Sequence, residues 1–247
     1  MTRVTPWREL RIAPDGERIA ALEAGRERAA SPLAAIERWN IDALLKREVT
    51  AEAPATFDEM LPLWVGKAAL RPAAVARIEA YRGFLGEYGL AERFTALLDE
   101  AARDRGALLE CDLGPAHDFL LLDMHLERLP DERPLLIVEA GGGYGPLAEL
   151  VIRHGRRRCC LVLADAIAES VFYSWAYLRA RLPEARIGAA FLGERLRPEA
   201  QDAFVVPAWE LPETVPAMDG FVNIASMQEM PDEAVAAWLT FCARRLR

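Results

Sequence analysis

The pattern of apolar and polar positions divides the chain into a helical first part and a mixed second part. Residues 1 to 130 place apolar positions at helical spacing between turn residues, without convincing strand alternation. We therefore expect an all-helical N-terminal region. Four helices are predicted within it: after Ser31-Pro32, from Arg71-Pro72 to Gly89, from about Ala91 to Arg105, and over Phe119 to Leu129.

Residues 131 to 247 show a different pattern, in which short apolar runs alternate with segments whose apolar positions have helical spacing. Runs typical of strands buried on both faces occupy Leu135–Val138, Cys159–Ala164, Ala203–Val206 and Phe221–Ala225. Helices are predicted over Leu147–His154, Ile167–Leu182 and Asp232–Arg247. This alternation predicts an α/β fold with right-handed crossovers and a parallel, Rossmann-like sheet.

Composition and charge narrow the classes of partner. The chain has 247 residues, with 30 Lys and Arg against 38 Asp and Glu, for a formal net charge of −8. This balance disfavours nucleic acid as a partner, because covering phosphates takes a basic face. No apolar stretch is long enough to span a bilayer and the N-terminus lacks a signal peptide's apolar core, so a cytoplasmic protein without a membrane partner is expected. The four cysteines form no CxxC pair, so neither disulfides nor a metal site is expected.

The segment with the clearest chemical meaning runs from Glu139 to Gly145, where an acidic residue at a strand end precedes closely spaced glycines. Gly141, Gly143 and Gly145 let the backbone turn sharply and approach a ligand. The following helix presents free N–H groups, so a nucleotide-like ligand is expected. A dinucleotide motif starting at Gly141 would need glycine in place of Pro146, which makes a nicotinamide oxidoreductase the weaker hypothesis.

Asp165 stands twenty residues after Gly145, at the end of the second predicted strand. One carboxylate there is well matched to the two vicinal hydroxyls of a ribose. Two other interpretations stay open. Asp165 is also suited to cap the helix that begins near Ala166, and Glu139 is also suited to be a buried carboxylate that satisfies loop amides.

The E-x-G-x-G-x-G spacing resembles motif I of class I S-adenosylmethionine-dependent methyltransferases. Together with VVPAWELP and FVNIASMQEM, it is similar to the sugar O-methyltransferase family over about residues 115 to 240. The resemblance implies a cofactor-binding methyltransferase domain over residues 131–247, preceded by a lid or dimerisation region over 1–130. It also implies S-adenosylmethionine as cofactor and a sugar or glycosylated small molecule as the acceptor, methylated on a hydroxyl.

The resemblance assigns roles to individual residues. Glu139 would reach the amino group of the cofactor's methionine part, and Asp165 its ribose. The full set expected at the cofactor is Glu139, Gly141, Gly142, Gly143, Tyr144, Gly145, Asp165, Ala166, Ala208, Trp209, Asn223 and Ser226. Glu229 is the first candidate for the catalytic base, with Gln228 beside it, and Asp123 and His125 are second candidates.

Two features depart from the methyltransferase pattern. The acid that usually meets the adenine amino group after the third strand has its nearest match in Glu210. The sheet of this class also needs three more strands after the last predicted helix, so we expect either a truncated chain or an edge covered by N-terminal helices or by a second subunit. The alternative function is therefore a catalytically inactive, methyltransferase-like binding or scaffold protein, and a homodimer is left open.

Overall fold

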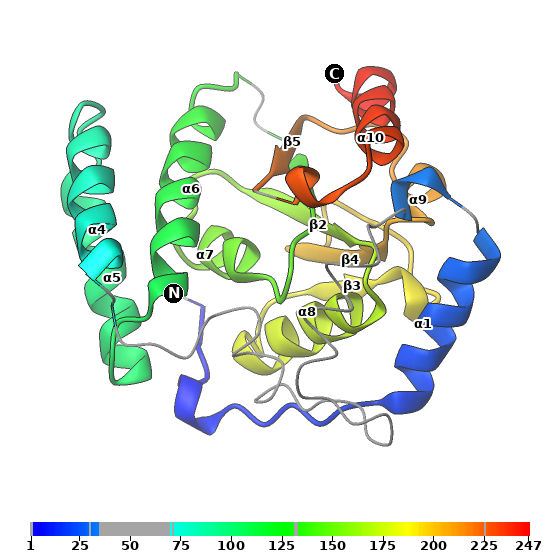
Figure 1. Ribbon diagram of the computed structural model, residues 1–247, viewed down its shortest axis with the longest axis horizontal. Coiled ribbons are helices and arrows are strands. Elements are labelled where there is room, and N and C mark those ends of the chain that lie inside the picture. The colour runs from blue at the N-terminus through cyan, green and yellow to red at the C-terminus, as the bar shows by residue number, and fades with distance from the viewer. Residues whose placement is uncertain (1, 30, 35–69, 71, 131–132, 225) are drawn as a thin grey trace.

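The structure is a computed structural model that describes residues 2–29, 31–34, 70, 72–130, 133–224 and 226–247, without the side chains of Glu110 and Glu229. At its centre lies a five-stranded sheet with helices on both faces (Figure 1). Every strand pair in this sheet is parallel. The chain therefore adopts a Rossmann-like α/β fold in these residues, as the alternation of apolar runs and helical spacing predicts.

The order and direction of the strands determine which residues meet at the carboxyl edge of the sheet. Across the sheet the order is β3-β4-β2-β1-β5. The strands are β1 (Leu135–Ala140), β2 (Cys159–Asp165), β3 (Ile187–Ala189), β4 (Ala203–Pro207) and β5 (Gly220–Asn223). Ala140 at the end of β1 pairs with Ala164 on one side and with Asn223 on the other. Because the strands are parallel, their carboxyl ends meet at one edge, where open α/β sheets bind ligands.

Helices cover both faces of the sheet. The α-helices of the described residues are α1 (Gly16–Ala29), α4 (Pro72–Gly86), α5 (Ala91–Arg105), α6 (Glu110–Leu126), α7 (Pro146–His154), α8 (Ala168–Arg181), α9 (Leu211–Thr214) and α10 (Asp232–Arg245). Ile137 and Leu163 join a core with α4 to α8, whereas Val138 and Val162 join a second core with α9 and α10. Successive strand residues point to opposite faces, so one sheet supplies both cores.

Several predicted elements are confirmed and others are corrected. The helices expected over Ala91–Arg105, Leu147–His154 and Ile167–Leu182 are present as α5, α7 and α8. α6 begins at Glu110 rather than near Phe119. The helix expected after Ser31-Pro32 starts as the 3-10 turn η2 (Pro32–Ala34), and the rest of it lies outside the described residues. α1 and β3 were not predicted.

After α10 the chain returns to the edge of the sheet. The Met218 N–H donates to the Arg245 carbonyl (2.8 Å), and the Arg247 N–H donates to the Met218 carbonyl (3.0 Å). The next residue, Asp219, donates to the Leu136 carbonyl on the opposite side. Leu246 thus lies parallel to Met218, on the side of the β5 segment that faces away from β1.

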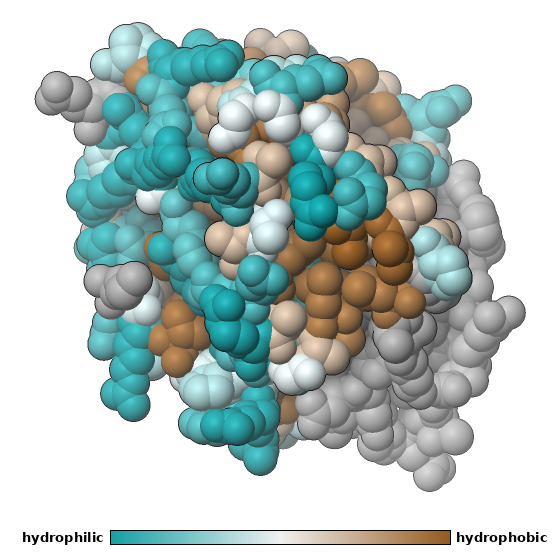
Figure 2. Space-filling model, turned by 90° about the vertical axis from the view of Figure 1, so that its left-hand side faces the viewer, coloured by the Kyte–Doolittle hydropathy of each residue, from teal (hydrophilic) through white to brown (hydrophobic). Residues whose placement is uncertain are grey.

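The surface on the side that carries α4 contains both apolar and hydrophilic side chains. In that view an apolar area lies among hydrophilic side chains (Figure 2). The exposed apolar side chains of α4 include Val75 and Phe84. Among the helices that the structure describes, none combines the length and apolarity needed to cross a membrane.

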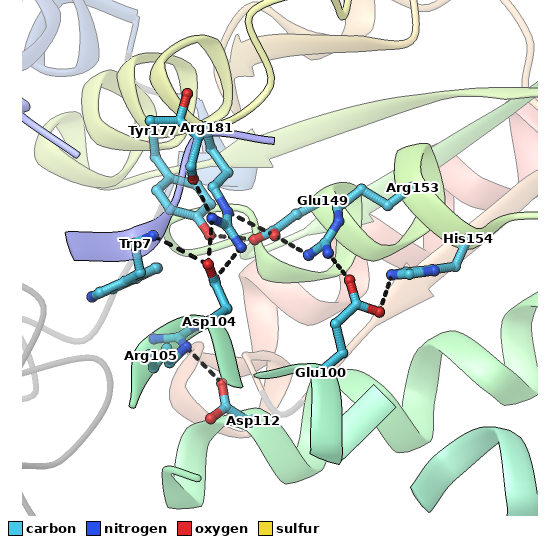
Figure 3. Close-up of polar contacts among 11 residues, drawn as sticks. Trp7, Glu100, Asp104, Arg105, Asp112, Glu149, Arg153, His154, Tyr177 and Arg181 are labelled. Atoms are coloured by element: carbon cyan, nitrogen blue, oxygen red, sulfur yellow. Dashed lines mark hydrogen bonds and ion pairs between the residues drawn. The ribbon is translucent and has the colours of Figure 1, made fainter. Parts of the chain in front are cut away.

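A buried polar network connects α7 with α5 and α8 (Figure 3). Glu149, in the first turn of α7, accepts hydrogen bonds from Arg153 Nη1 (2.6 Å), from Arg181 Nε (2.9 Å) and from the Tyr177 hydroxyl. Arg181 also binds Asp104 of α5. Burial alone raises the pKa of Glu149, but Arg181 and Arg153 outweigh burial and hold that pKa below its ordinary value.

The same network fastens the N-terminal segment to the domain. The Trp7 N–H donates to Asp104 (3.2 Å), and Arg181 donates to the Thr5 carbonyl. The guanidinium of Arg105 lies 3.7 Å from the centre of the Trp7 ring, within range of a cation–π interaction. Hydrogen bonds to charged side chains and a cation–π contact therefore hold the N-terminal segment against α5 and α8.

The network generates a stability prediction. Arg181→Met removes a principal cation from buried Glu149, and we expect a loss of about 3 kcal/mol in unfolding free energy because a buried charge is left undercompensated. Urea unfolding followed by circular dichroism measures the loss. Arg186→Met, which breaks an exposed pair with Asp202, is the matched control and should lose less than about 1 kcal/mol. Equal losses in the two variants would contradict this account.

Candidate functional site

A glycine loop (residues 141–145) lies at the carboxyl edge of the sheet, between β1 and α7. Gly141, Gly143 and Gly145 have φ values of 74°, 55° and 95°, in the left-handed region that favours glycine. The Gly141 N–H donates to the Ala164 carbonyl (2.8 Å), which ties the start of the loop to β2. α7 begins directly afterwards at Pro146, so its free N–H groups face this edge.

The glycine loop has a closed and an open side. A Cβ atom added to Gly141 would lie 2.2 Å from the Ser226 Oγ, and one added to Gly142 would lie 3.1 Å from Leu163 Cδ2. A Cβ added to Gly143 would meet no heavy atom of the described residues within 4 Å. The loop is therefore packed against β2 and the segment after β5, while Gly143 marks the side that a ligand can approach.

Asn223 and Ser226 close one side of the glycine loop. The Ser226 hydroxyl donates to the Ala140 carbonyl (2.7 Å), and Asn223 Nδ2 donates to both the Ser226 Oγ (2.7 Å) and the Ala140 carbonyl (3.1 Å). The Asn223 side-chain Oδ1 in turn accepts the Met227 N–H (3.1 Å). The structure brings both residues to the predicted site, where they fasten the end of β5 to the end of β1.

Among the described strand residues of this edge, Glu139 combines burial with a missing partner. Only 4% of the residue is exposed, and its Oε2 has no hydrogen-bond partner among the described residues. Burial, assisted by the negative charges of Asp165 and Asp118, raises the pKa of Glu139 to about 8. The interpretation in which Glu139 satisfies loop amides does not account for Oε2, because an unpaired buried acceptor is unfavourable.

Asp165 ends β2 beside the glycine loop, as predicted. Its Oδ1 accepts the Ile167 N–H (2.9 Å) and its carbonyl accepts the Ala208 N–H (2.8 Å). The carboxylate thus stabilises the turn before α8 while lying close enough to Glu139 to affect it electrostatically. Ala166 and Ala208 are buried next to these turns, so they shape the site through the backbone.

The side chains of two aromatic residues expected at the cofactor pack against other elements of the described structure. The Trp209 indole lies against α1, where a Cβ added to Gly25 would be 3.4 Å from the indole Nε1. Tyr144 is buried, with its ring centre 5.1 Å from that of Tyr177 and 6.5 Å from that of Trp7. The Tyr144 side chain therefore connects the glycine loop to the N-terminal segment, and only its backbone belongs to the loop.

The candidates for the catalytic base need correction. Asp123 is buried and accepts hydrogen bonds from Arg93 Nη2 (2.8 Å) and from the Arg156 N–H (2.9 Å) in the segment that leads into β2. It therefore lies at the amino edge of the sheet, away from the glycine loop. His125 is exposed in the last turn of α6. Neither residue is placed to act at the predicted cofactor.

The other base candidates lie in the 3-10 turn η4 (Met227–Glu229), next to the glycine loop. Gln228 is exposed there, and the side chain of Glu229 lies outside the described part of the structure. Sequence reasoning missed Asp118, which acts on Glu139 from α6, a helix that precedes the sheet in the chain. No spacing signal could reveal this neighbour, because the approach of α6 to β1 depends on tertiary packing.

Carboxylates are the ionisable side chains near the glycine loop that the electrostatics connect. In the described ranges, no three His, Cys, Asp or Glu side chains are arranged to hold a metal ion. Asp165 and Asp118 place negative charge near Glu139. No protein-family model matches the chain, and no curated protein or solved structure is detectably similar to it.

The raised pKa of Glu139 predicts how stability depends on pH. Because the folded-state pKa is about 8 against an ordinary 4.5, its stabilising contribution is complete below pH 4.5 and is lost as the pH rises towards 8. Glu139→Gln cannot ionise, so between pH 5 and 8 the variant should gain about 3 kcal/mol relative to the wild type.

Urea unfolding at both pH values measures this gain, and the exposed Glu87→Gln serves as control. Only Glu139→Gln should show the gain. A parallel pH dependence for wild type and Glu139→Gln would mean that this carboxyl titrates normally and would contradict the assigned environment.

Proposed function

We propose that the protein is an S-adenosylmethionine-dependent methyltransferase that acts on a hydroxyl of a sugar or glycosylated small molecule. The observation that carries the proposal is Glu139, a buried carboxylate with an unpartnered oxygen directly beneath the glycine loop. An ammonium group would supply the missing donor and favour the ionised carboxylate. The methionine part of the cofactor carries such a group.

The charge of the site favours this cofactor over a nicotinamide dinucleotide. S-adenosylmethionine carries a sulfonium and an ammonium against a single carboxylate, whereas a dinucleotide carries an anionic pyrophosphate. The negative charges of Asp165 and Asp118 near Glu139 attract the first and repel the second. Pro146, at the position where a dinucleotide motif has its last glycine, agrees with this choice.

Each residue of the site has a separate role in binding or positioning the cofactor. Glu139 would bind the ammonium group, Asp165 the ribose hydroxyls, and the backbone around Gly143 would lie along the cofactor. The cofactor supplies the methyl group. Asn223 and Ser226 hold the loop after β5 against β1, which keeps the glycine loop in position for an acceptor and a cofactor to meet in line.

The acceptor class rests on the resemblance of the FVNIASMQEM segment to sugar O-methyltransferases. Trp209 favours the second candidate, a methyltransferase-like binding protein without turnover, because the contact of its indole with α1 gives this side chain a packing role. The two candidates differ in one observable: both bind the cofactor, and only the first transfers its methyl group to an acceptor.

Cofactor binding is tested by calorimetric titration with S-adenosylhomocysteine. We expect micromolar affinity in the wild type and about tenfold or greater weakening in Asp165→Ala, because hydrogen bonds to a charged group are lost. Asp99→Ala, an exposed aspartate on α5, is the matched control and should bind as the wild type does. Stronger binding of NADH than of S-adenosylhomocysteine would contradict the proposal.

Proton release gives an independent test of the role of Glu139. At pH 7 most of this carboxyl is protonated, because its pKa is about 8. Binding of an ammonium group should ionise it and release up to about one proton, measured by titration in buffers of different ionisation enthalpy. Glu139→Gln should release no proton. Equal proton release by the two proteins would contradict the assignment of Glu139 as the partner of the ammonium group.

A further inference from the structure

Residues 3–10 form a strap that lies against α5 and the end of α8 (Figure 3). The Thr5 N–H donates to the Arg181 carbonyl (2.8 Å), and the Arg181 side chain donates back to the Thr5 carbonyl. The Trp7 N–H donates to Asp104 of α5. Hydrogen bonds of its main chain therefore attach the strap to two helices of the domain.

The strap buries little of its own surface. No residue of its 3-10 turn η1 (Trp7–Glu9) is fully buried. Val4 and Trp7 are partly buried against the core that α4 to α8 share, and Leu10 is buried there. Because segments with few buried contacts open at a lower free energy than a core does, we expect the strap to open without unfolding of the sheet.

Trp7 connects the strap with the glycine loop. The centre of its ring lies 6.5 Å from that of Tyr144, in edge contact, and 5.7 Å from that of Tyr177. Tyr177 in turn lies 5.1 Å from Tyr144. One ring from the strap, one from the loop and one from α8 therefore form a single aromatic cluster, with the Arg105 guanidinium against Trp7.

The Tyr144 side chain has space beside it. A cavity of about 50 Å³ is lined by Tyr144, Pro146 and Arg105, among other residues. A side chain next to a cavity lacks partner atoms on that side, so its position depends more strongly on the neighbours that it does contact. For Tyr144 these neighbours include Trp7, and the cavity gives the ring room to move when Trp7 withdraws.

We propose that the strap positions the glycine loop through Trp7, so that a ligand of the loop binds more weakly when the strap is open. Trp7 is a positioning residue, because it acts through Tyr144. The effect on cofactor affinity rests on the proposed function, whereas the effect on the loop does not. Linkage makes the coupling reciprocal, so a ligand that prefers the closed strap also holds it closed.

The first test needs no ligand and uses amide hydrogen exchange measured by NMR. The Gly145 N–H donates to the Gly142 carbonyl (2.9 Å) within the loop. Trp7→Leu, which keeps an apolar side chain, should speed exchange of the Gly145 amide by about tenfold, because the loop opens more often. Trp7→Phe should restore the wild-type rate, because a ring again contacts Tyr144.

Two controls separate this effect from a general loss of stability. The Leu161 amide of β2 reports opening of the sheet, and Trp7→Leu should change its exchange less than that of Gly145. Trp175→Leu replaces another partly buried tryptophan, which packs on Phe172 and Phe191, and should leave Gly145 unchanged. Exchange of Gly145 that is unchanged in Trp7→Leu, or raised no more than that of Leu161, would overturn the proposal.

The second test links the strap to the ligand by calorimetric titration with S-adenosylhomocysteine. Trp7→Leu should bind about fivefold to tenfold more weakly, because fewer molecules have the closed strap, while Trp7→Phe and Trp175→Leu stay within about twofold of the wild type. In the wild type, saturation with S-adenosylhomocysteine should slow exchange of the Trp7 amide, which Asp104 holds. This last measurement needs no variant.

The outcomes distinguish the two proposals. If the wild type does not bind S-adenosylhomocysteine, the proposed function fails, and exchange of Gly145 still decides whether the strap positions the loop. If the wild type and Trp7→Leu bind S-adenosylhomocysteine equally, the cofactor site stands and the coupling of the strap to the ligand is overturned.

Discussion

The burial of Glu149 between two arginines is the interaction on which the site depends most. It fixes the first turn of α7, directly after the glycine loop, and it connects this turn to α5, α8 and the N-terminal segment. On the other side, Ser226 holds the end of β1. The loop is therefore held from both sides, and Gly143 can face a ligand without being supported by one.

Beside this firmly held loop, Glu139 has a buried carboxylate oxygen that lacks a hydrogen-bond donor among the described residues. A buried acceptor without a donor destabilises a fold, so its presence calls for a physical explanation. Its raised pKa has the same cause, since burial and neighbouring carboxylates both oppose its ionisation. A cationic ligand would relieve both conditions at once, which links the stability of the free protein to the function proposed for it.

The sequence was sufficient for the central strands and for the glycine loop, because apolar runs and closely spaced glycines are local signals. β3 escaped prediction because Ile187-Gly-Ala is a three-residue edge strand, and α1 escaped because it buries only Ile19 and Leu22. Whether Asp118 or Asp123 lies near Glu139 depends on which turn of α6 approaches β1. Such information is tertiary, and no spacing within the helix carries it.

The most direct test compares the affinity of S-adenosylhomocysteine with that of its deaminated analogue, in the wild type and in Glu139→Gln. We predict that the wild type prefers the amine by about tenfold or more and that the variant loses this preference, because Glu139 is the proposed partner of the amino group. An unchanged preference in Glu139→Gln would contradict the central claim.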